Sequence, residues 1–195
     1  SHNYNLASTI PQERNDAAEY YTECIKLAAD LSCPVVVVPG WRMYGTAYSQ
    51  AWEWSRQGIS RISKAAEDTG VILALEPITK AMVNLVNTTQ QALEMIQQVE
   101  SPVVKLMLDT AHMAMEKESP IDTVLEAGEY LVHVHVEDSD GRSMWRLPPV
   151  KDCLVPFCVL DHGGPPVGSW TLTLCPEASV RSMRETRLSL DQWGL

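Results

Sequence analysis

Basic residues are scarce in this chain of 195 residues, in which 15 Lys and Arg stand against 25 Asp and Glu and leave a formal net charge of −10. Proteins that bind a nucleic-acid backbone need clustered Lys and Arg, because these side chains neutralise the phosphates they contact. We therefore expect no nucleic-acid partner.

Long hydrophobic runs are absent as well. No segment approaches the roughly 20 apolar residues that cross a bilayer, and the polar residues 1–5 lack the basic and apolar regions of a signal peptide. The five cysteines are an odd number at irregular spacing, which fits reduced thiols better than a disulfide framework. We expect a cytoplasmic protein with no membrane partner.

Four short apolar runs are the clearest signal for regular structure. Residues 34–39, 71–76, 103–109 and 131–137 are nearly continuous in Val, Ile and Leu, as parallel strands buried on both faces are. Each run is separated from the next by enough chain for one helix, which predicts an α/β fold with a parallel sheet. A complete eight-fold barrel usually needs about 250 residues, so we expect a partial (β/α)8 TIM barrel.

The intervening stretches carry helix start and stop signals. We expect helices over about 16–31 and over about 47–68, the second ending at Gly70. Thr88 and Gln91 have the spacing of a capping box, and Ser119 before Pro120 marks another start, with Gly128 as its stop.

Three of the apolar runs end on side chains that can bind a divalent cation: Glu76, Asp109 and His135. Parallel strands bring their carboxyl ends to one rim of a barrel, so these groups should converge there.

Structural alternatives exist for each residue. Asp109 could only cap the next helix, and Glu76 could be an exposed charge at a loop entrance. His133 and His135 share strand parity and point the same way, so we expect His133 in the core and His135 as the ligand. His112 suits either a substrate contact or a structural hydrogen bond, and Trp41 suits packing better than sugar stacking.

Residues 1–142 resemble the xylose-isomerase-like barrels of the sugar phosphate isomerase/epimerase superfamily, in particular its branch of ketose 3-epimerases acting on D-tagatose and D-psicose. The resemblance rests on residues 34–41, on Leu-Glu76-Pro, on Met-Leu-Asp109-Thr-Ala-His112-Met and on His133-Val-His135. It implies that Glu76, Asp109 and His135 bind one divalent metal, that Glu76 is also an acid/base group, and that His112 and Arg142 bind substrate oxygens.

The implied activity is metal-dependent isomerisation or epimerisation of a ketose or related polyol, by proton abstraction next to a carbonyl. A cation held by carboxylates and an imidazole stabilises the enediolate charge, while a carboxylate over the sugar takes the proton. Mixed oxygen and nitrogen ligands suit Mn²⁺, Co²⁺ or Mg²⁺, and Zn²⁺ is also compatible. The expected partner is a small-molecule sugar.

Residues 143–195 lack the Gly-rich loop and the final glutamate-bearing strand that the family would show. The segment holds half of the prolines and three of the five cysteines, and no helical or strand period persists in it. We expect a divergent, irregular tail that is foreign to the barrel, as a frame change would produce, and a start that lacks the first two strands. Glu177, after a strand-like run, is the single candidate there for a second acid/base carboxylate.

Two classes of function stay open. One is a sugar epimerase or isomerase, with inosose dehydratase and hydroxypyruvate isomerase as relatives sharing these motifs. The other is an inactive barrel fragment that retains only metal or partner binding. In either class, an open barrel leaves unpaired strand edges and apolar surface, so we expect the isolated chain to be unstable or to associate with another copy.

Overall fold

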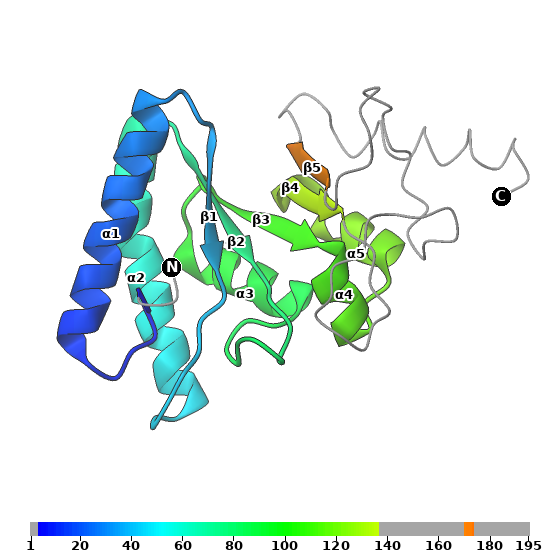
Figure 1. Cartoon of the computed structure of the whole chain (residues 1–195), viewed down its shortest axis with the longest axis horizontal. Coiled ribbons are helices and arrows are strands. Elements are labelled where there is room, and N and C mark those ends of the chain that lie inside the picture. Colours follow the sequence, from blue (N-terminus) through cyan, green and yellow to red (C-terminus); the bar gives the residue numbers. More distant parts are fainter. Residues whose placement is uncertain (1–3, 137–169, 174–195) are drawn as a thin grey trace, which may run out of the picture.

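The computed structural model describes residues 4–136 and 170–173 and places five strands in one sheet, in the order β1-β2-β3-β4-β5 (Figure 1). The strands are β1 (Val35–Pro39), β2 (Ile72–Glu76), β3 (Val104–Asp109), β4 (Leu131–Val136) and β5 (Trp170–Thr173). The first four pair in parallel and in chain order, which confirms the four predicted strands.

The fifth strand departs from the βα pattern. β5 lies within the segment expected to be irregular and pairs antiparallel with β4, so that Thr171 stands opposite His135. An antiparallel edge strand on an otherwise parallel sheet is common in mixed sheets. The predicted domain boundary at residue 142 lies outside the described residues and stays a prediction.

Among the described residues, five α-helices connect or precede the strands: α1 (Pro11–Asp30), α2 (Tyr48–Thr69), α3 (Thr89–Val99), α4 (Thr110–Glu116) and α5 (Pro120–Ala127), followed by the 3₁₀ turn η1 (Gly128–Tyr130). The prediction that the first helix starts near residue 16 was wrong. It starts at Pro11, because proline suits the first helical position, where its missing N–H needs no partner.

The predicted helix ends are confirmed at the other positions. Gly70 follows α2 in the left-handed region, with φ of 75°. Thr88 and Gln91 form the reciprocal capping box at the start of α3. Ser119 accepts a hydrogen bond from the Asp122 N–H at the start of α5, which ends before Gly128.

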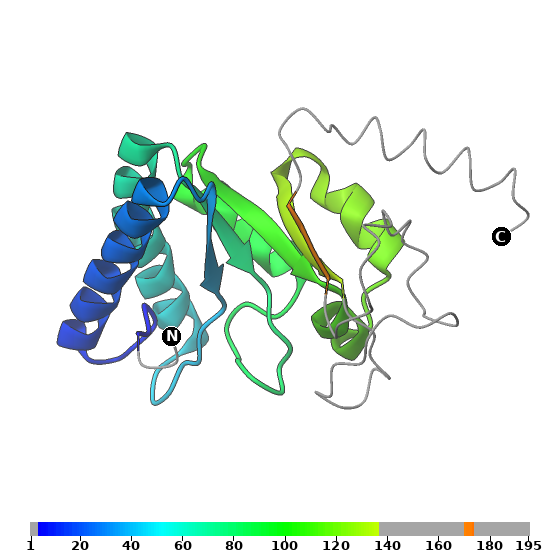
Figure 2. The same cartoon turned by 45° about the horizontal axis from the view of Figure 1, so that its top comes forward.

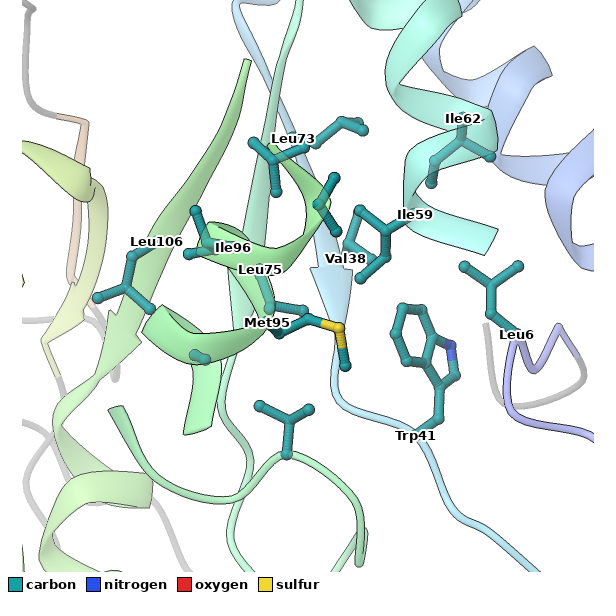
Figure 3. Close-up of a cluster of buried hydrophobic side chains, with 14 of the residues drawn as sticks. Leu6, Val38, Trp41, Ile59, Ile62, Leu73, Leu75, Met95, Ile96 and Leu106 are labelled. Carbon is teal, nitrogen blue, oxygen red and sulfur yellow. The ribbon is translucent and has the colours of Figure 1, made fainter. Parts of the chain in front are cut away.

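The helices α1 and α2 lie side by side and pack against β1 and β2, while α3 packs against β2 and β3 (Figures 1 and 2). Figure 3 shows the resulting core, in which strand residues Val38, Leu73 and Leu75 meet Ile59 from α2 and Met95 from α3. Each of these side chains is almost fully buried. Burying one such side chain contributes about 1.5–3 kcal/mol, so this layer holds the strand ends in register.

Within residues 4–136 and 170–173, no helix combines the length and apolar character needed to cross a bilayer.

Candidate metal centre

Three buried side chains at the carboxyl end of the sheet form a cluster able to hold a metal ion. Glu76 ends β2, Asp109 ends β3 and His112 lies in the first turn of α4. One ligand atom from each lies within 4.8 Å of those of the other two. The convergence of Glu76 and Asp109 follows from the parallel strands, which bring their carboxyl ends to one edge.

Asp109 combines the two roles that the sequence left open. Its Oδ1 accepts hydrogen bonds from the backbone N–H groups of Ala111, at 2.8 Å, and of His112, at 3.4 Å, and so caps α4. Its Oδ2 lies 3.7 Å from Nδ1 of His135. The helix cap therefore leaves the second carboxylate oxygen directed at the site.

His135 reaches the site from the neighbouring strand. It stands opposite Asp109 in the pairing of β3 with β4, which places both side chains on the same side of the sheet. Its side chain is 29% exposed, whereas that of Asp109 is fully buried. His135 thus borders the Glu76, Asp109 and His112 cluster through Asp109.

His133 is buried beside His135, with the two rings 5.0 Å apart and nearly perpendicular. Burial lowers the pKa of His133, and the neighbouring His135 lowers it further. Both histidines lie on one side of β4, as their strand parity predicts.

The backbone of Glu76 is fixed by the loop after β1. Its carbonyl accepts a hydrogen bond from the Gly40 N–H at 2.9 Å. A Cβ atom at Gly40 would lie only 2.6 Å from the Val86 carbonyl oxygen, so only glycine fits this approach of the two loops. The Glu76 carboxylate faces α4, with Oε1 at 3.9 Å from Nε2 of His112.

A cavity of about 660 Å³ opens beside Glu76 and His112. Its wall includes Trp41, Arg42 and Met82. Trp41 is 4% exposed, which agrees with the prediction that it packs in the core, although the residue also lines the cavity. A volume of this size can admit a small sugar.

Two loops that contribute residues to the cavity wall are hydrogen-bonded to each other. Arg42 donates hydrogen bonds to the carbonyls of Met82 and Ala81. Asn84 accepts from the Met43 N–H at 2.7 Å and donates to the Met43 carbonyl at 3.2 Å. The loops after β1 and β2 are therefore joined directly by hydrogen bonds.

No local pattern in the sequence indicates these contacts, because Arg42 and Asn84 are about 40 residues from their partners. Two predicted site residues, Arg142 and Glu177, lie outside the described residues. The roles assigned to the individual residues stay predictions.

The donor set fits a divalent cation. Two carboxylates buried this close together repel each other, and a cation between them compensates their charge. Mn²⁺, Co²⁺, Mg²⁺ and Zn²⁺ can all be bound by carboxylate oxygens together with imidazole nitrogens. The chemistry of the donors therefore does not determine which metal binds.

Comparison with known proteins agrees with this geometry. A family model described as xylose isomerase-like TIM barrel matches residues 1–162. The D-psicose 3-epimerase of Ruminiclostridium cellulolyticum is 30% identical over 153 residues, which cover 72% of this chain and 52% of the relative. The fructoselysine 3-epimerase of Escherichia coli O157:H7 is 28% identical over 141 residues, 72% of this chain and 51% of the relative.

Solved structures show the same similarity. The D-psicose 3-epimerase with D-tagatose from Clostridium cellulolyticum H10 superposes with a TM-score of 0.64 at 31% identity, over 71% of this chain and 50% of that one. The 3-keto-D-glucoside 4-epimerase from E. coli, with a TM-score of 0.67 at 19% identity over 71% of this chain and 56% of that one, shares the fold. The chain spans about half the length of the curated relatives described above.

Proposed function

The chain belongs to the xylose isomerase-like TIM barrel family, and from this membership and the paired carboxylates of Glu76 and Asp109 we propose that it is a metal-dependent sugar isomerase or epimerase. The single observation that carries the proposal is the convergence of two buried carboxylates and an imidazole beside a cavity of sugar size. The proposed reaction is proton abstraction next to the carbonyl of a ketose or related polyol.

In this proposal Glu76, Asp109 and His135 hold the metal. The contact between His135 and Asp109 supports a shared ion, because the two groups already face each other across paired strands. A divalent cation bound there would stabilise the negative charge that develops on the substrate oxygens. Mn²⁺, Co²⁺ and Mg²⁺ are the proposed metals, with Zn²⁺ as a further candidate.

Glu76 is the proposed base. Its carboxylate borders the cavity and is 11% exposed, so it can reach a substrate carbon while most of its surface is shielded from water. His112 also borders the cavity and lies beside Glu76, a position from which its imidazole can bind a substrate oxygen. Trp41 supplies an apolar wall that helps to exclude water.

The substrate class is proposed from the cavity and the relatives together. Relatives at 30–33% identity include D-psicose 3-epimerases, a ketose 3-epimerase and an L-ribulose 3-epimerase. A ketose is therefore the proposed substrate class.

A Mn²⁺ titration followed by two assays tests the proposal. The chain should bind Mn²⁺, and with Mn²⁺ it should exchange substrate hydrogen with solvent deuterium when given D-fructose, D-psicose or D-tagatose. Net epimerisation, measured in parallel by chromatography, separates full turnover from exchange alone. Metal binding without exchange would instead support the competing proposal of an inactive barrel that binds only metal or a partner.

The cytoplasm is the proposed compartment, and the free thiols of Cys24 and Cys33 among the described residues support it. Association with a second copy is proposed because β1 lies at the end of the sheet in the part of the chain that the structure describes.

A further inference from the structure

Glu116 is an acid that the proposed chemistry does not use. It is the last residue of α4, and its side chain is 7% exposed. Its Oε1 accepts hydrogen bonds from the Thr79 hydroxyl and from the Lys80 N–H, both at 2.8 Å. Its Oε2 lies 3.1 Å from the Lys80 ammonium. One carboxylate thus receives three donors from a loop that precedes it by 36–37 residues.

That loop is the segment that leads from Glu76 to α3. It turns at Thr79, whose carbonyl accepts from the N–H groups of Met82 and Val83. Ala81, Met82 and Val83 line the cavity next to Glu76. The position of Thr79 therefore governs where this wall of the cavity lies.

The helix that carries Glu116 also carries His112. The two residues are four apart, so they lie one above the other on the same face of α4. A helix of seven residues is not stable alone, so it depends on its contacts with the rest of the fold, among them the packing of the buried Met113 and the hydrogen bonds at its two ends. Asp109 holds the first turn, and Glu116 holds the last one against the loop.

Glu116 is charged in this environment. Burial by itself would raise its pKa, but the hydrogen bonds from Lys80 and Thr79 and the Lys80 ammonium outweigh burial and lower the pKa overall. Charged acceptors make stronger hydrogen bonds than neutral ones. The Lys80 side chain is 69% exposed, so its ion pair contributes little and the two shorter hydrogen bonds carry the contact.

We propose that Glu116 is a positioning residue that ties α4 to the loop after β2 and so fixes the imidazole of His112 against the carboxylate of Glu76. The inference rests on the proposed function where it concerns metal binding. It stands on the contacts alone where it concerns the helix.

Glu118 offers a matched control two residues further along. It is also a glutamate that accepts two hydrogen bonds from a distant segment, the Thr89 N–H at 2.9 Å and the Thr89 hydroxyl at 3.3 Å. Those hydrogen bonds hold the start of α3, and neither Glu118 nor Thr89 lines the cavity. Loss of Glu118 should therefore cost stability without moving His112.

The test compares Glu116→Ala, Glu116→Gln, Thr79→Val and Glu118→Ala by Mn²⁺ titration and by amide hydrogen exchange of α4. Glu116→Ala should weaken Mn²⁺ binding about 10-fold, the scale for removing a residue that orients a ligand, and should speed exchange at the N–H groups of His112 and Lys117. Glu116→Gln keeps an acceptor for Thr79 and the Lys80 N–H and should restore most of the affinity. Thr79→Val, which keeps the side-chain volume, should show a smaller loss, and Glu118→Ala should leave Mn²⁺ affinity and α4 exchange unchanged.

Equal losses in Glu116→Ala and Glu118→Ala would overturn the positioning role, as would unchanged α4 exchange in Glu116→Ala. If Glu116→Ala does not fold, wild-type values in both Glu116→Gln and Thr79→Val overturn it, and an α4-specific change in Thr79→Val supports it. A wild-type chain that binds no Mn²⁺ would reject the proposed function, and the exchange data would then decide the positioning role.

Discussion

Asp109 and His135 occupy paired positions on neighbouring parallel strands, with Nδ1 of the histidine 3.7 Å from Oδ2 of the aspartate. The other aspartate oxygen caps the helix that follows. One carboxylate thus orders the start of α4 and presents an oxygen to the imidazole, so that the fold and the proposed metal site share a residue.

Asp109→Asn should separate these two tasks. Asparagine keeps an oxygen that caps a helix as well as aspartate does, but it loses the charge. We expect Mn²⁺ affinity to fall by more than about 100-fold, beyond the loss seen for residues that only orient ligands, with a melting temperature close to that of the wild type. Calorimetric titration and thermal melting measure the two effects. Comparable Mn²⁺ binding in Asp109→Asn would remove Asp109 from the ligand set.

Glu76→Gln should abolish solvent exchange of the substrate hydrogen, because the amide cannot accept the proton. A general base contributes about 100- to 10,000-fold, so the exchange rate should fall at least by the lower figure. Deuterium incorporation in the presence of Mn²⁺, followed by NMR, measures it. The variant Glu53→Gln, which alters only the contacts of Glu53 with Arg56 and Gln57 on α2, is the control and should exchange at the wild-type rate.

Substitutions of the two histidines near Asp109, His112 and His135, should have different effects on Mn²⁺ affinity. If His135 is the ligand, as proposed, His135→Asn should lower Mn²⁺ affinity by more than about 100-fold, whereas His112→Asn should lower it only about 10-fold, the scale for a residue that orients a ligand, and should show a raised KM. Direct loss of a ligand costs more than loss of a residue that orients one. The reverse result would assign the metal to the Glu76, Asp109 and His112 cluster, whose ligand atoms all lie within 4.8 Å of one another.

Glu116 and Glu118 should influence stability with opposite dependence on pH. The pKa of Glu116 lies below its ordinary value of 4.5, since hydrogen bonds from Lys80 and Thr79 outweigh the opposing effect of burial. Its contribution to the free energy of unfolding is therefore complete above pH 4.5 and is lost as the pH falls through the folded-state pKa. The pKa of Glu118 is raised, chiefly by burial, so stability should decrease as the pH rises from 4.5 through the folded-state pKa.

Urea unfolding between pH 3.5 and 7 measures how each glutamate changes the free energy of unfolding with pH. Relative to the wild type, Glu116→Gln should lose the decline on acidification, and Glu118→Gln should lose the decline on raising the pH. Each titration is limited to about 1.4 kcal/mol per pH unit for one proton. If the free energy of unfolding depended on pH in the same way in both variants, the opposite pKa shifts of Glu116 and Glu118 would be contradicted.

The edge of β1 should promote association. β1 lies at one end of the described sheet, and Val35, Val36 and Val37 are partly exposed there. Open edges and apolar surface favour pairing with another chain. Sedimentation should therefore depend on protein concentration, and Val37→Lys should shift the equilibrium toward the monomer. Gln97→Lys, on the exposed face of α3, adds the same charge elsewhere and should have no such effect. A wild-type monomer at all concentrations would contradict the proposed association.

Much of the fold was predictable from the sequence, because the relevant signals are local. Nearly continuous Val, Ile and Leu predicted the four parallel strands, and the pair Thr88 and Gln91 predicted the start of α3. The start of α1 at Pro11 differs from the predicted start near residue 16, since the first turn of the helix carries no apolar repeat.

The chemical types at the strand ends were also determined by the sequence alone. Glu76 and Asp109 end their strands as predicted, and parallel pairing brings any such residues to one edge. The tertiary structure decided which further groups join them. His112 enters the cluster because α4 begins directly after Asp109, and Glu116 reaches Thr79 across 37 residues because β2 and β3 are adjacent. Such contacts depend on strand register and helix placement, which follow from packing of the whole core, whereas caps and strand runs depend on a few neighbouring residues.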